Sequence, residues 1–192
     1  MHSSQHFRNQ RSVLKVAATT LKNADVPFAL AGGYAIWARG GRESTHDVDF
    51  VVTGKHVDAA RAALAAEFEV LENGEDWLFK VARGAVVVDV IHHLPTGDVD
   101  DAMLSRADWM SVDSVDMPVM AATDILLNRL LALTEQFCNL SPIIAAARSL
   151  REQVDWPHVA LEVRANPFAS ACLQVLTDLR VIEQPAKGVA GV

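Results

Sequence analysis

Short apolar runs alternate with amphipathic segments along the first two thirds of the chain. Segments with apolar positions on one helical face predict helices, and β-prone runs bounded by glycine, proline or asparagine predict strands. We expect helices at about 10–24, 34–39, 55–66 and 101–107, strands at about 28–31, 47–52, 68–71, 77–83 and 85–91, and a hairpin within 112–119. This mixture predicts an α+β fold, in which helices flank a mixed sheet.

The pattern changes after residue 121, where helical periodicity alone continues. Helices are expected at about 122–137, 141–151, 157–165 and 168–182, and Pro142, Pro157 and Pro167 are typical of first helical turns. We therefore predict an α/β region over residues 1–120, a C-terminal helical bundle over 121–183 and a loose tail over 184–192.

The composition is that of an ordinary globular protein, with 51% hydrophobic and 21% charged residues in a chain of 192. The formal charge of −7 argues against a surface that is basic all round. Two isolated cysteines suggest neither a metal site nor a disulfide framework and favour a reducing, cytoplasmic compartment. Apolar stretches fall well short of about 18 residues, so no membrane span is expected.

The first candidate for chemistry is a pair of carboxylates at the start of the strand predicted at 47–52. Asp47 and Asp49 are two residues apart, so their side chains leave the same face of that strand. Neighbouring carboxylates repel one another unless a positive charge lies between them, and a hard divalent cation is the usual solution. Taken alone, the pair favours a plain polar entry to a strand over a metal site.

A third carboxylate shifts the balance from a polar strand entry towards a metal site. Asp89 interrupts the apolar run 85–91, which is too apolar for an edge strand. If Asp89 shares a sheet face with Asp47 and Asp49, each carboxylate pair about 4 Å apart costs on the order of 4 kcal/mol at an effective dielectric near 20. Such a group needs a cation, and the alternative for Asp89 is an arginine partner such as Arg42.

A glycine pair lies upstream of these carboxylates. Gly32 and Gly33 join a predicted strand to a predicted helix, where free backbone N–H groups favour phosphate and glycine lets a ligand approach the backbone closely. A plain turn would also explain the pair. In combination with the carboxylates, however, it indicates a phosphate-binding turn ahead of a metal site.

These residues resemble the minimal nucleotidyltransferase superfamily, whose catalytic domain is a palm of the DNA polymerase β type. The resemblance covers residues 31–91 and rests on Gly32-Gly33, on Arg42-x-x-Thr45-x-Asp47-x-Asp49, and on Asp89. Within the superfamily, the pattern looks most like the nucleotidyltransferase toxins of bacterial toxin–antitoxin pairs, including the abortive-infection type. The resemblance thus implies a nucleotidyltransferase palm followed by the helical bundle.

The resemblance also implies roles for these residues. Asp47, Asp49 and Asp89 would bind two Mg²⁺ ions that hold a nucleoside triphosphate, and Asp89 would help to deprotonate the attacking hydroxyl. Gly32 and Gly33 would cradle the β- and γ-phosphates. The remaining nucleotide-binding candidates are basic or hydroxyl side chains: Arg42, Thr45 and Arg129, with Arg39 as a weaker one.

Two departures from the family pattern matter. Tyr34 stands where many members have a phosphate-binding serine, and its hydroxyl cannot take the same position. Arg129 stands where many relatives have a lysine, which keeps the charge but changes the geometry.

The acceptor is the point on which the hypotheses differ. The resemblance implies the 3′ end of tRNA as the acceptor, which would make the protein a toxin with a cognate antitoxin protein as partner. A second hypothesis keeps the chemistry but replaces tRNA with a small antibiotic of the aminoglycoside or lincosamide type, which would suit the acidic charge. The third is a palm-fold module that binds without catalysis.

Overall fold

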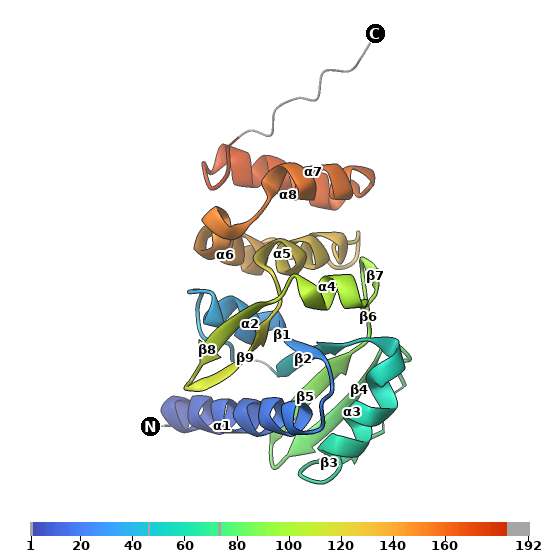
Figure 1. Cartoon of the computed structure of the whole chain (residues 1–192). Coiled ribbons are helices and arrows are strands. Elements are labelled where there is room, and N and C mark those ends of the chain that lie inside the picture. The colour runs from blue at the N-terminus through green and yellow to red at the C-terminus, as the bar shows by residue number, and fades with distance from the viewer. Residues whose placement is uncertain (1, 46, 73, 184–192) are drawn as a thin grey trace. The chain divides into compact units, whose positions relative to one another are not determined.

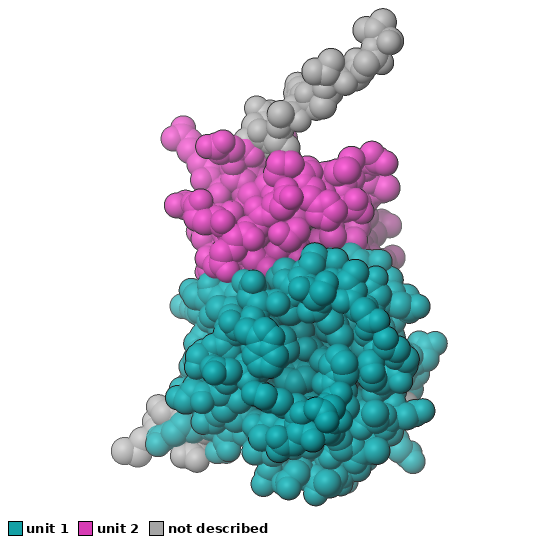
Figure 2. All heavy atoms as spheres, in the orientation of Figure 1, with its two compact units in different colours: residues 1–121 teal, residues 122–192 magenta. Residues whose placement is uncertain are grey.

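The computed structural model describes residues 2–45, 47–72 and 74–183, and the tail predicted at 184–192 lies outside them. The chain divides into two compact units, residues 1–121 and 122–192, coloured teal and magenta in Figure 2. Of the helices in the described ranges, none combines the length and the apolar character needed to cross a membrane.

The first unit is built on a seven-stranded mixed sheet (Figure 1), which confirms the predicted α+β fold. The sheet has the strand order β3-β4-β5-β2-β1-β9-β8, with parallel pairing of β2 with β5 and of β1 with β9. Its strands are β1 (Phe28–Ala31), β2 (Val48–Val52), β3 (Glu69–Leu71), β4 (Leu78–Arg83), β5 (Val86–Ile91), β8 (Asp108–Val112) and β9 (Val115–Val119). A separate small hairpin consists of β6 (His93–Leu94) and β7 (Gly97–Asp98).

The two faces of β5 differ in exposure. Val86, Val88 and Val90 are buried, whereas the alternate positions Val87, Asp89 and Ile91 are half-exposed. On the buried face, α1 contacts β5 and α3, and Arg61 of α3 stacks over the ring of Phe79. The helices of this unit are α1 (His2–Asn23), α2 (Gly32–Ala38), α3 (Val57–Leu64) and α4 (Asp101–Ser105), with a 3₁₀ turn at Gly54–His56. On the opposite face, Asp49 and Asp89 are half-exposed, whereas Val51 and Ala31, which lie beside them on β2 and β1, are buried.

The C-terminal hairpin of the sheet is larger than the sequence predicts. The expected hairpin lies within 112–119, but β8 already begins at Asp108. The turn residues Asp113 and Ser114 both have positive φ, of 47° and 71°, as a tight two-residue hairpin turn requires. Neither residue is glycine, so the usual sequence signal for such a turn is missing.

The second unit is helical, as predicted. It consists of α5 (Ala122–Leu131), α6 (Ser141–Leu150), α7 (Trp156–Glu162) and α8 (Pro167–Asp178), with 3₁₀ turns at Arg151–Gln153 and Val163–Ala165. Helix α5 contacts the other three helices.

The end of α5 differs from the sequence expectation. The helix stops at Leu131, although periodicity predicts it to continue to about residue 137. Asn166 explains the difference, because its amide donates to the carbonyls of Leu131 and Leu133 while its side-chain oxygen accepts from the backbone of Phe168 and Ala169. One side chain thus caps the end of α5 and the start of α8, a contact that no local pattern reveals.

Arg39 fastens α2 to the end of β9. Its guanidinium donates to the carbonyls of Met120, at 2.7 Å, and Val119, at 3.0 Å, and forms an ion pair with Asp108 at 2.6 Å. The side chain is only 5% exposed. The suggestion that Arg39 contacts phosphate is therefore wrong, because its donors are committed to the sheet.

We predict that Arg39→Met lowers the free energy of unfolding by about 2–4 kcal/mol, because it leaves buried carbonyls without donors. Urea unfolding followed by circular dichroism measures the change. The matched control is Arg83→Met, since Arg83 is 45% exposed and its ion pair with Glu67 is long, at 3.4 Å. The control should change stability by no more than about 0.5 kcal/mol. Equal losses in both variants would contradict the structural role of Arg39.

Candidate functional site

Two of the three predicted carboxylates, Asp49 and Asp89, lie side by side on one face of the sheet. The parallel strands β2 and β5 pair Asp49 with Asp89, so the two residues occupy neighbouring positions in register. Val48 and Phe50, which flank Asp49, point to the opposite face and are fully buried. Asp47 lies directly before β2, two residues ahead of Asp49, and is exposed. The structure therefore brings Asp49 and Asp89 together, while Asp47 lies at the entry to the same strand.

Asp89 has a partner that the sequence analysis did not identify. The ammonium of Lys80, on β4, lies 3.0 and 3.1 Å from the two carboxylate oxygens of Asp89. The pair is partly screened from water, with side-chain exposures of 27% for Lys80 and 15% for Asp89. The partner is thus not Arg42, which is exposed in the loop before β2.

A sequence signal for Lys80 did exist. Arg83-Gly84 is recognisable as a hairpin turn, and a two-residue turn at 84–85 pairs Arg83 with Val86. Counting back along the ladder from that turn places Lys80 opposite Asp89, as the structure has it. The register of the hairpin therefore carried the information.

The surroundings of Lys80 favour its charged form. Burial acts to lower the pKa of Lys80, but the hydrogen bond to Asp89 and the negative charges of Asp89, Glu75 and Asp47 outweigh it and raise the pKa above its ordinary value. Lys80 is therefore a permanent cation at neutral pH.

The glycine turn lies directly against Asp49. The antiparallel pairing of β1 with β2 sets Ala31 opposite Asp49, so the next residue, Gly32, begins α2 beside that carboxylate. A Cβ on Gly32 would lie 1.8 Å from Oδ2 of Asp49, and Gly32 has a φ of +58°. Both the space and the backbone conformation therefore require glycine here.

Gly33 makes room for a different side chain. A Cβ on Gly33 would lie 2.5 Å from the hydroxyl of Ser44, which is buried in the loop before β2. Tyr34 points elsewhere, since its hydroxyl donates to Gln10 of α1 at 2.9 Å. Burial, together with the charge of Glu43, raises the pKa of Tyr34 to about 12. The hydroxyl at the glycine turn thus belongs to Ser44, a residue that the sequence analysis did not single out.

The other predicted nucleotide-binding residues are placed as follows. Thr45 is exposed in the same loop as Arg42, between α2 and β2. Arg129 lies on α5 in the second unit and is half-buried. Their contacts with a nucleotide stay predictions.

The carboxylates fit a divalent cation by their chemistry and position. Asp49 and Asp89 offer hard oxygen donors from adjacent strands, which lie about 4.8 Å apart. As the side chains stand, no three His, Cys, Asp or Glu residues within the described ranges are close enough together to hold a metal ion. Lys80 accounts for part of this arrangement, because its ammonium already neutralises Asp89.

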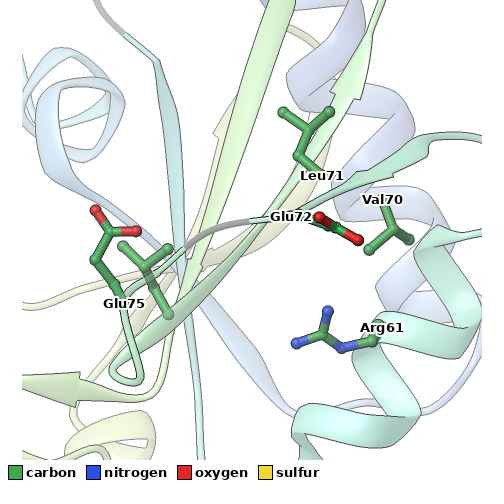
Figure 3. A pocket seen from close by; sticks show the side chains of 6 residues that line it. Arg61, Val70, Leu71, Glu72 and Glu75 are labelled. Carbon is green, nitrogen blue, oxygen red and sulfur yellow. The ribbon is translucent and has the colours of Figure 1, made fainter.

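A pocket of about 400 Å³ lies at the β3 edge of the sheet (Figure 3). Its charged lining consists of Arg61, from α3, together with Glu72 and Glu75, from the segment between β3 and β4. The apolar lining residues are Val70, Leu71 and Leu78. The pocket lies near the Lys80–Asp89 pair, because the negative charge of Glu75 is one of those that raise the pKa of Lys80.

Comparison with solved structures identifies the fold. The chain is similar to ANT(2")-Ia in complex with adenylyl-2"-tobramycin, with a TM-score of 0.62 and 17% identity over 85% of this chain and 98% of that one. It is also similar to a nucleotidyltransferase-like protein from Paracoccidioides brasiliensis, with a TM-score of 0.52 and 17% identity over 89% and 88% of the two chains. The lincosamide adenylyltransferase LnuA, bound to lincomycin, has a TM-score of 0.50 and 10% identity over 70% and 91%.

These likenesses show that the chain has the nucleotidyltransferase fold. At 10–17% identity they establish the fold and nothing finer. No protein-family model matches the chain, and its sequence matches no curated protein.

We predict that Gly32→Ala is more damaging than its backbone strain alone explains. Gly84 provides the matched control, because its φ of +64° is similar but a Cβ there would meet no atom within 4 Å. Gly84→Ala should cost about 1–2 kcal/mol, the usual penalty for the left-handed conformation. Gly32→Ala must in addition displace Asp49, so its midpoint in urea should fall further. Equal midpoints in the two variants would contradict the close approach of Asp49.

Proposed function

We propose that the chain is a nucleotidyltransferase, which moves a nucleoside monophosphate from a nucleoside triphosphate to an acceptor hydroxyl. One observation carries the proposal: Asp49 and Asp89 lie in register on one face of the sheet, and Asp49 lies directly against a glycine turn. In the nucleotidyltransferase fold, such an arrangement provides oxygen ligands for a cation beside a backbone that phosphate can approach.

The residues divide the work as follows. A divalent ion held by Asp47, Asp49 and Asp89 would supply positive charge to the triphosphate. Gly32 and Gly33 leave their backbone open to the β- and γ-phosphates, with the hydroxyl of Ser44 nearby. The acceptor oxygen forms a bond to the α-phosphorus, the bond from that phosphorus to the β-phosphate oxygen breaks, and pyrophosphate leaves. Asp89 accepts the proton of the acceptor hydroxyl.

For the acceptor, we propose a small, positively charged molecule of the antibiotic type. Residues 1–121 contain eleven Lys and Arg against seventeen Asp and Glu. An RNA acceptor favours a basic surface, because each phosphate contact uses a Lys or Arg. The pocket at the β3 edge is lined by two carboxylates, Glu72 and Glu75, and by Arg61, so its lining carries one net negative charge that would attract amino groups. Two proteins of similar fold, ANT(2")-Ia and LnuA, carry antibiotic-derived ligands in their structures.

The tRNA 3′ end, the toxin role and the antitoxin partner stay predictions from the sequence. The tRNA hypothesis and the proposal differ in the acceptor, so one transfer assay can compare the two acceptors.

We predict Mg²⁺-dependent transfer of label from an α-³²P nucleoside triphosphate to tobramycin or lincomycin. The purified chain is incubated with each of the four triphosphates, with tobramycin, lincomycin or total tRNA as acceptor, and the products are separated by chromatography or gel. Asp49→Asn and Asp89→Asn should each reduce transfer by at least about a hundredfold, because they remove charge that the transition state needs.

The matched control is Asp58→Asn, an exposed aspartate in the first turn of α3 on the other side of the sheet from Asp89. Its activity should equal that of the unmodified protein. Label in tRNA alone would overturn the proposed acceptor and support the toxin hypothesis. Transfer to none of the acceptors, in a protein that also fails to bind a nucleoside triphosphate, would overturn the proposed function.

A further inference from the structure

Three charged side chains form one row across three neighbouring strands. Asp49 on β2 pairs with Asp89 on β5, and Asp89 pairs in turn with Lys80 on β4. All three lie on the same face, because residues paired directly across a sheet point the same way. The row therefore runs negative, negative, positive, with Asp89 between the other two.

The ammonium of Lys80 lies within hydrogen-bond distance of both carboxylate oxygens of Asp89. Its distances to the two oxygens, 3.0 and 3.1 Å, are almost equal, so the positive charge lies close to both of them. Six residue pairs between β4 and β5 fix the register, so Lys80 is held opposite Asp89 by the backbone. Its side chain, however, is a flexible four-carbon stem that can swing away from the carboxylate.

We propose that Lys80 is a built-in counter-ion that competes with a divalent metal ion for Asp89 and thereby weakens metal binding at the carboxylate row. The inference rests on the proposed function, in which Asp89 is a metal ligand. Lys80 is a positioning residue: it holds the carboxylate of Asp89 in place when no metal is bound and gives it up when a metal arrives with its nucleotide.

The physical reason is a balance of charge. Asp49 and Asp89 repel one another on adjacent strands, and a single ammonium offsets part of that repulsion. A divalent ion entering the row meets the positive charge of Lys80, so it must displace the ammonium from Asp89 before both oxygens are free. A nucleoside triphosphate brings negative charge with the metal, which lowers the cost of that exchange.

The test is a measurement of Mn²⁺ affinity without nucleotide or acceptor, by isothermal titration calorimetry or by the electron paramagnetic resonance signal of free Mn²⁺. Lys80→Met should bind Mn²⁺ at least about tenfold more tightly than the unmodified chain, because the competing charge is gone. Lys80→Arg keeps the charge and should stay within about twofold. Asp49→Asn combined with Lys80→Met should lose the gain, which places the ion in the row.

The matched control is Lys55→Met. It changes the net charge of the chain by the same amount, but Lys55 is 60% exposed and pairs with Asp101 at the surface. If Lys55→Met tightened Mn²⁺ binding as much as Lys80→Met, a general effect of net charge would replace the proposal. Urea unfolding of each variant verifies that it is folded.

A second measurement follows thermal unfolding with and without MgCl₂. Lys80→Met removes the ammonium that pairs with Asp89, so Mg²⁺ should raise the Tm of this variant by more than it raises that of the unmodified chain. A purely structural lysine would lower Tm in both conditions alike.

The proposal and the proposed function can fail separately. Unchanged or weaker Mn²⁺ binding in Lys80→Met overturns the competition, whatever the transfer assay gives, and so does the absence of Mn²⁺ binding in every variant. Tighter binding in Lys80→Met supports the competition even if none of the acceptors is labelled.

Discussion

The register between β2 and β5 is the constraint on which the rest of the site depends. Parallel pairing places Asp49 beside Asp89 on a sheet face that is partly open to solvent, while the alternate residues Phe50 and Val90 fill the core. Because the side-chain period of a strand is two, a slip of β2 by one residue would turn Asp49 to the buried face and Phe50 to the opposite one. The hydrophobic face that stabilises the sheet therefore also fixes the position of the charges.

The same carboxylates dictate what can surround them. Gly32 has no Cβ because an oxygen of Asp49 takes that space, and Gly33 leaves room for Ser44. Helix α2, which starts at this turn, is anchored at its other end by the buried Arg39. The glycine turn thus lies against Asp49, and the helix that follows it is fastened to the end of β9.

In the proposed function, the residues that would transfer the nucleotide differ from those that would select the acceptor. In that function, the chemistry depends on the oxygen donors and the glycine turn, which lie within residues 32–89 of the first unit. The acceptor depends on the charge and shape around them, where acidic residues outnumber basic ones. The nucleotidyltransferase fold is compatible with different acceptors, since ANT(2")-Ia and LnuA carry different bound antibiotics or products in their structures.

The sequence by itself determined the α+β class, the helical second half and the candidate carboxylates, because alternation, helical periodicity and an aspartate within an apolar strand are local signals. It also singled out Gly32, although the reason, the oxygen of Asp49, became visible only in the structure. Tertiary structure alone decided where α5 ends, and it showed that Lys80 meets Asp89, which only the register of the hairpin at Arg83-Gly84 could have indicated in advance. Lys80 and Asn166 act through partners on other elements, at positions set by strand register and helix packing. A side chain's own sequence neighbourhood carries its preference for helix, strand or burial, but not the identity of the group that packing brings to it.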